Sequence, residues 1–200
     1  MERRKSGMEM FLAGWIVVLA ANYLGGLNTG AWIPLLVSGT QLIALIVVFV
    51  GIRKLKEQRQ SSGSAGFVTA LAIVATVGIG ILQFLSMDNL SAWMSIAALC
   101  LTFSGDVLFL LLTGLVLAGA MKHEPGKEES SRRLDLRYRW ILFLTFDILY
   151  LLIQSMAVVL ANENLPALTY VVPATGIPVL IAGIMIVTEL YRIHSVQEKE

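Results

Sequence analysis

Charged side chains are scarce in this sequence. Asp, Glu, Lys and Arg make up 14% of its 200 residues, hydrophobic residues make up 56%, and the mean hydropathy is +0.76. Soluble domains carry about 25% charged residues, so this composition excludes an ordinary soluble domain. A single cysteine, Cys100, excludes an internal disulfide, and a net charge of +1 gives no sign of nucleic-acid binding.

Continuous apolar runs take the place of the missing charge. We predict six spans, at about 8–25, 31–52, 66–86, 94–121, 140–162 and 167–191. Apolar runs of about 20 residues have the length of a helix that crosses a bilayer, whereas the strands of a membrane barrel would alternate polar and apolar residues. The sequence therefore predicts an all-α integral membrane protein: one transmembrane domain over residues 1–200, built as a six-helix bundle in the lipid bilayer.

Positive charge falls on one side of this arrangement. All 15 Lys and Arg lie in the N-terminal tail or after the second, fourth and sixth spans, while the opposite side carries only Asp88 and Glu163. Cytoplasmic segments carry the excess of Lys and Arg. We therefore expect both termini in the cytoplasm and a multi-pass protein of the plasma membrane. The basic start at 1–5 also resembles a secretory signal, but we favour an uncleaved helix because the first two spans pair as the later ones do.

A short pattern recurs at the three turns on the outer side. Asn28-Thr29-Gly30-Ala31-Trp32 is followed by related pentads at 89–93 and 164–168. An Asn at this place caps the free N–H groups of a first helical turn. Two interpretations follow: three repeated helical hairpins, or Asn caps that recur wherever a tight outer turn is needed.

The fourth predicted span carries one charge, Asp106, near its middle. A carboxylate at the centre of a membrane helix costs about 2.5–3.5 kcal/mol on insertion scales, and such residues mark functional sites by default. Thr102 and Thr113 share its helical face, at i−4 and i+7. We expect Asp106 to be protonated, paired or beside water, and the spans contain no Lys or Arg that could form an ion pair with it.

Other polar residues form stripes that we expect to face the interior of the bundle. Asp147 in the fifth span shares a face with Tyr150 and Gln154. The third span carries Thr69, Thr76, Gly80 and Gln83 along one side, and the second span carries Ser38 and Gln41. Each aspartate either binds a ligand or makes structural interhelical hydrogen bonds, which are worth about 0.6–2 kcal/mol.

The sixth span contains two prolines, Pro173 and Pro178, with Gly176 between them. Prolines inside a helix remove backbone donors and favour a kink or a break. Broken helices present carbonyl groups to the substrate in many transporters, so Pro178 is a candidate binding-site residue. A kink that serves only packing is the alternative.

Three hypotheses for function follow. We favour a transport-type protein that binds a small solute, an ion or a proton in a midplane polar cavity around Asp106, with Asp147, Thr102, Tyr150, Gln154, Gln83 and Pro178 as further candidates. The alternative is a non-catalytic membrane subunit or regulator that docks a cytoplasmic or membrane partner through a cytoplasmic loop at 122–139. For the loop itself we favour a solvated charged segment over a docking site. The third is an intramembrane enzyme that uses Asp106 and Asp147.

Motif patterns leave an enzyme the least favoured of the three. The sequence has no phosphate-binding loop, dinucleotide fingerprint or H-E-x-x-H pattern, so we assign no catalytic residue, metal ligand or cofactor. Ser104-Gly105-Asp106 and Phe146-Asp147 resemble, in part, the two aspartate motifs of presenilin-type intramembrane proteases, which would imply peptide hydrolysis by paired carboxylates. The first glycine of that pattern is missing and the order of the motifs is reversed. Size and topology also resemble the substrate-binding subunits of modular vitamin importers, an analogy of fold that would join the first two hypotheses.

Overall fold

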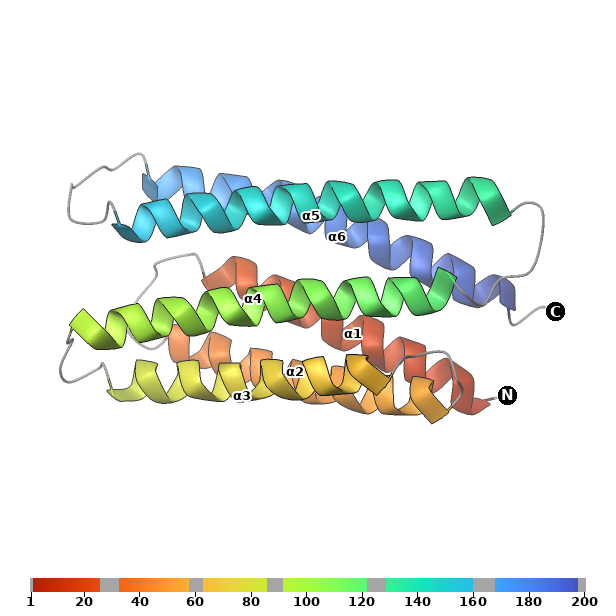
Figure 1. The fold of residues 1–200 in the computed structure, drawn as a ribbon, viewed down its shortest axis with the longest axis horizontal. Helices are drawn as coiled ribbons and strands as arrows, with labels where there is room; N and C mark the ends of the chain where they lie inside the picture. Colours follow the sequence, from red (N-terminus) through yellow and green to blue (C-terminus); the bar gives the residue numbers. More distant parts are fainter. Residues whose placement is uncertain are drawn as a thin grey trace. The chain divides into compact units, whose positions relative to one another are not determined.

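Six α-helices make up the part of the chain that the computed structural model describes, which is residues 2–25, 33–57, 63–85, 92–121, 129–159 and 168–197. In chain order they are α1 (Glu2–Gly25), α2 (Ile33–Glu57), α3 (Gly63–Leu85), α4 (Ala92–Met121), α5 (Glu129–Val159) and α6 (Leu168–Gln197) (Figure 1). These described residues contain no strand. The all-α class predicted from the continuous apolar runs is therefore confirmed.

Four of the described helices are long and apolar enough to cross a membrane. Their apolar segments are Ile33–Glu57, Ser64–Leu85, Ile96–Gly119 and Ala174–Arg192, in α2, α3, α4 and α6. α1 holds a shorter apolar stretch, Gly7–Asn22. The six-span count and the orientation of the termini therefore stay predictions. The three recurring pentads lie almost entirely outside the described residues, as does 122–128.

Residues 129–139, which the sequence analysis placed in a loop, form the first part of α5. The expectation of a loop over the whole of 122–139 is therefore wrong in this half. The charged side chains of this segment do not interrupt the helix, because they lie on its exposed side. Leu136 is 1% exposed, whereas its neighbours Asp135 and Arg137 are exposed. This is the pattern of an amphipathic helix.

The described helices fall into two compact units, each of which is considered by itself. The first unit contains α1 to α4, in which α1 packs on α2, α2 on α3 and α3 on α4. The second unit is the antiparallel hairpin of α5 and α6 (Figure 1).

Glycines allow α1 and α2 to approach very closely. A Cβ atom added at Gly14 would lie 2.7 Å from the carbonyl oxygen of Ala44, and one added at Gly51 would lie 2.7 Å from the backbone nitrogen of Phe11. No real Cβ tolerates such distances to backbone atoms, so only glycine fits at these two positions. Small residues at helix contacts are typical of membrane bundles, where close backbone packing replaces the hydrophobic effect.

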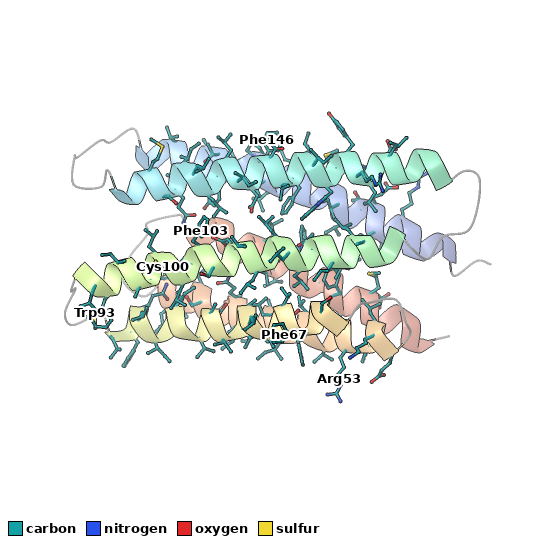
Figure 2. All side chains as sticks on the ribbon, viewed as in Figure 1. Arg53, Phe67, Trp93, Cys100, Phe103 and Phe146 are labelled. Atoms are coloured by element: carbon teal, nitrogen blue, oxygen red, sulfur yellow. The ribbon has the colours of Figure 1, made fainter. Side chains whose placement is uncertain are left out.

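α3 carries its large side chains on the outside and its small ones on the inside. Its exposed stripe consists of Phe67, Leu71, Val74, Val77, Ile81 and Phe84, and its buried stripe of Ala65, Thr69, Ala72, Ala75, Thr76 and Ile79. Phe67 is 66% exposed, and Figure 2 shows its side chain on the outer side of α3. Water would disfavour such a surface, whereas lipid chains would cover it. The distribution is that of a helix embedded in a bilayer.

The second unit is held together by a heptad pattern and one ion pair. On α6 the buried residues Val172, Gly176, Val179, Gly183, Ile186 and Leu190 follow each other at spacings of four and three, as in helices that pack at a shallow angle. Arg139 Nη1 of α5 lies 3.4 Å from Glu189 Oε2 of α6 and donates a hydrogen bond to the Met185 carbonyl at 3.0 Å. Glu189, 4% exposed, is therefore paired with a cation.

Candidate functional site

One face of α4 lies against α1 in an antiparallel register. Asp106 and Thr113 of α4 bond to Asn22 and Trp15 of α1, respectively. Both pairs of positions are seven residues apart, which is two helical turns or about 10 Å. The two hydrogen bonds therefore tie the helices together at two levels of the first unit.

Asp106 belongs to a chain of hydrogen bonds that links three helices. Asn22 Nδ2 donates to Asp106 Oδ1 at 3.1 Å, and Gln41 Nε2 of α2 donates to Asn22 Oδ1 at 2.7 Å. All three side chains are half-buried. The donors in this chain run toward the carboxylate, so the amide groups place partial positive charge where Asp106 carries its negative charge.

A further hydrogen bond brings in α3. Ser38 of α2 donates from Oγ to Gln83 Oε1 at 2.7 Å. Ser38 precedes Gln41 by three residues, so both lie on one side of α2. We call the five residues Asn22, Ser38, Gln41, Gln83 and Asp106 the polar layer. Each helix of the first unit contributes to it at least once.

The polar layer lies close to the end of α1 and far from the start of α4. α1 continues for only three residues after Asn22, about 5 Å, while α4 has already run for 14 residues, about 21 Å, before it reaches Asp106. Gln83 lies two residues before the end of α3. Counting residues along α4 alone puts Asp106 at mid-span. Its partners place the layer in the half of the first unit where α1 and α3 end.

Two turns from the layer, toward the start of α1, an aromatic contact fills the space between α1 and α4. Trp15 is 2% exposed, its ring stacks on Phe109 at 5.4 Å between centroids, and its Nε1 donates to Thr113 Oγ1 at 2.8 Å. Thr113 in turn donates to the Phe109 carbonyl at 2.8 Å. The indole is thus buried with its polar N–H bonded, as buried tryptophans require.

The five residues of the polar layer include one carboxyl group and no cationic side chain. The sequence has no Lys, Arg or His within ten residues of any member of the layer. Arg53, the nearest along α2, follows Gln41 by about 18 Å of helix and extends outward from the end of that helix (Figure 2).

The structure assigns the other candidate residues to different surroundings. Gln83 belongs to the polar layer through Ser38, and Thr102 lies half-buried one turn before Asp106 on α4. Two threonines of the predicted α3 stripe, Thr69 and Thr76, donate to carbonyls of their own helix at 2.7 and 2.9 Å. They are buried without taking part in the layer.

Asp147, Tyr150, Gln154 and Pro178 belong to the second unit. Tyr150 is 6% exposed, and Asp147 and Gln154 are half-buried. Counting from the Arg139–Glu189 pair along the two antiparallel helices places Tyr150 level with Pro178. α6 is continuous through both of its prolines, so the expected alternative of a broken helix is wrong, and Pro178 does not lie at a helix end.

Two residues that the sequence analysis missed carry important contacts. Asn22 is the central member of the chain to Asp106, and Trp15 makes the aromatic contact. Asn22 is the one amide in the apolar stretch Gly7–Asn22, a signal that could have drawn attention to it. Nothing in the sequence shows that it meets Asp106, which lies 84 positions away.

The described residues contain no group of three His, Cys, Asp or Glu side chains close enough to hold a metal ion. Cys100 is exposed on α4 and reduced. The long apolar helices and the outward large side chains of α3 define the class of the protein, a helical protein embedded in a membrane. No family model, curated protein or solved structure matches the chain.

Proposed function

We propose that the chain is a transport-type membrane protein that binds a small solute, an ion or a proton at the polar layer around Asp106. The observation that carries this proposal is the chain from Gln41 through Asn22 to Asp106, which links three helices and includes one carboxyl group. A single interhelical hydrogen bond would serve packing alone. A connected polar layer in an apolar bundle is costly to bury, and a ligand that uses it accounts for that cost.

The topology that we propose with this function has six spans, with both termini in the cytoplasm of a plasma-membrane protein. The distribution of all 15 Lys and Arg supports it. In this orientation the polar layer lies toward the outer side of the membrane, since the ends of α1 and α3 face outward. Protease protection of N- and C-terminal tags in sealed vesicles tests the orientation: both tags are expected to behave alike.

A binding assay tests the proposed site directly. The full chain in lipid nanodiscs is screened by thermal unfolding against salts, buffers of different pH and a library of small polar solutes. A ligand of the layer is expected to raise the unfolding midpoint of the wild type and to lose this effect in Asp106→Asn. Ser104→Ala is the matched control on α4, because Ser104 is exposed and bonds only the carbonyl of Cys100. If every ligand that stabilises the wild type also stabilises Asp106→Asn equally, the proposed site is wrong.

A second function, docking of a protein partner at the start of α5, has its own supporting observation. Leu134 and Tyr138 are 63% and 66% exposed on this amphipathic segment, beside the exposed Arg137. If the protein is a non-catalytic subunit, Tyr138→Ala together with Arg137→Ala is expected to release a partner that co-purifies with the wild type. Asp106→Asn would then leave the complex intact.

A further inference from the structure

We propose that the end of α2 binds an anionic phospholipid of the surrounding leaflet. Arg53 contacts the phosphate of the head group, and the acyl chains lie along an exposed apolar stripe of the same helix. This interaction goes beyond the function proposed for the polar layer and does not depend on it, because no residue of the layer takes part.

The first reason is that the exposed apolar stripe of α2 ends at a cation. Ile43, Ile46 and Val50 are 66%, 47% and 37% exposed. They precede the exposed Arg53 at spacings of three, four and three residues, so all four side chains lie on one face of the helix. In a membrane-embedded helix, lipid chains cover such a stripe. The head group of the same lipid then lies beside the side chain that follows the stripe.

The length of α2 places Arg53 at the level of the head groups. Ile33, the first residue of α2, precedes Arg53 by 20 residues, which is about 30 Å of helix. A bilayer has a hydrocarbon core of about this thickness. The helix carries no charged side chain between these two residues, so Arg53 is its first cation at the boundary. An arginine at this depth can bind a phosphate group through two parallel N–H donors.

The surroundings of the neighbouring lysines distinguish two exposed cations from a half-buried one. Lys54 lies at the contact with α1, where its Nζ donates to Met10 Sδ at 3.5 Å and its Cβ lies 3.2 Å from a Cβ added at Gly7. Arg53 and Lys56 are exposed and three residues apart, so they lie on one side of α2. Figure 2 shows Arg53 extending outward from the end of the helix.

The charge at this end of α2 favours an anionic lipid over a zwitterionic one. Residues 53–57 contain three cations and one acidic residue, Glu57, which lies one turn beyond Arg53 and therefore farther from the apolar stripe. Each basic side chain near a membrane surface is worth about fivefold in affinity for anionic lipids. In the orientation proposed above, this end of α2 lies in the cytoplasmic leaflet, whose surface is negative.

The test titrates the full chain in detergent micelles with phosphatidylglycerol or phosphatidylcholine of identical acyl chains, and native mass spectrometry measures the affinity for the first bound lipid. The wild type is expected to bind phosphatidylglycerol more tightly than phosphatidylcholine. Arg53→Gln is expected to weaken binding of phosphatidylglycerol by about fivefold. Equal affinity of the wild type for the two lipids, or an unchanged affinity for phosphatidylglycerol in Arg53→Gln, would overturn the proposal.

Two matched variants separate a site at Arg53 from general attraction to basic residues. Arg137→Gln removes an exposed cation from α5, and Glu57→Gln changes the charge one turn from Arg53. Both variants are expected to bind phosphatidylglycerol at least about as tightly as the wild type. A loss in Arg137→Gln as large as that in Arg53→Gln would show general attraction and overturn the site.

The head group without acyl chains, glycerophosphoglycerol, tests whether the ligand is a lipid. It is expected not to bind at the concentrations at which phosphatidylglycerol saturates the wild type, because it lacks the contact with the apolar stripe. Arg53-dependent binding of glycerophosphoglycerol as tight as that of the lipid would identify a soluble phosphate ester as the ligand and overturn the proposal.

Discussion

Asn22 and Asp106, 84 positions apart in the sequence, are joined by a hydrogen bond of 3.1 Å between α1 and α4. Seven residues earlier on α1 and seven residues later on α4, Trp15 and Thr113 form the second such bond, at 2.8 Å. The two bonds fix the same antiparallel register. One contact stabilises the fold with an aromatic ring, and the other joins a carboxyl group to the chain that links three helices.

The Asn22–Asp106 bond is expected to stabilise the first unit modestly. A double-mutant cycle of Asn22→Ala and Asp106→Ala is expected to give a coupling free energy of about 0.6–2 kcal/mol, the range of interhelical hydrogen bonds in membranes. The free energy of unfolding is measured in mixed micelles by denaturant titration. Thr40→Ala provides a control, because Thr40 is exposed and bonds its own helix at the Leu36 carbonyl. A coupling free energy near zero would show that the Asn22–Asp106 hydrogen bond does not contribute to stability.

Variants of Trp15 are expected to separate the contribution of its ring to the free energy of unfolding from that of its N–H group. Trp15→Phe keeps a ring beside Phe109 and loses the bond to Thr113, so it should cost about 1 kcal/mol more than the change in packing alone. Trp15→Ala removes the ring from a fully buried place and should cost about 3–5 kcal/mol. Thr113→Val in the Trp15→Phe background should add little, because the bond is already gone. If the losses of unfolding free energy caused by Trp15→Phe and Thr113→Val simply add in the double variant, the hydrogen bond between Trp15 and Thr113 is contradicted.

The change in unfolding free energy when a glycine of α1 or α2 is replaced by alanine is expected to depend on what lies next to that glycine. Gly14→Ala and Gly51→Ala each force a methyl group to within 2.7 Å of a neighbouring backbone atom, so each should cost at least about 1–3 kcal/mol through overpacking. Gly39→Ala on α2 meets open space and should be neutral, or stabilising by up to about 1 kcal/mol through helix propensity. Unfolding free energies of the three variants under one set of conditions check the order. Equal effects at all three positions would mean that α1 and α2 are not in close contact.

The Arg139–Glu189 pair is expected to hold the α5–α6 hairpin. Arg139→Ala leaves the buried carboxylate of Glu189 without its cation, and breaking a buried pair costs about 3–5 kcal/mol. The lower end is expected here, since the Arg139 side chain is 25% exposed. Arg139→Met with Glu189→Leu should recover most of the loss, because two apolar side chains replace both charges. Proteolysis rates between α5 and α6 report the hairpin, and Arg137→Ala, at an exposed position, is the control.

Sequence patterns were sufficient for the class of protein and for the approximate place of each described helix, but one end of α1, α2, α5 and α6 was misplaced by at least five residues. Continuous apolar runs required helices that satisfy their own backbone hydrogen bonds in lipid, and the structure has a helix for each of the six predicted spans. The pattern misled at 129–139, where charge was interpreted as a loop. A helix that leaves the membrane can continue in water with charged sides, so charge alone does not mark its end.

What the sequence by itself determined is therefore local: helical periodicity, the apolar length of the helices, and the rarity of a carboxylate inside one of them. Asp106 could be singled out because its cost in lipid does not depend on its neighbours. Only the tertiary structure decided which side chains it meets. Asn22 reaches it because the register of α1 on α4 aligns the two residues, and Gln41 reaches Asn22 because Gly14 and Gly51 let α1 and α2 pack closely. Helix register and close approach arise from the packing of whole faces, which no single stretch of sequence encodes.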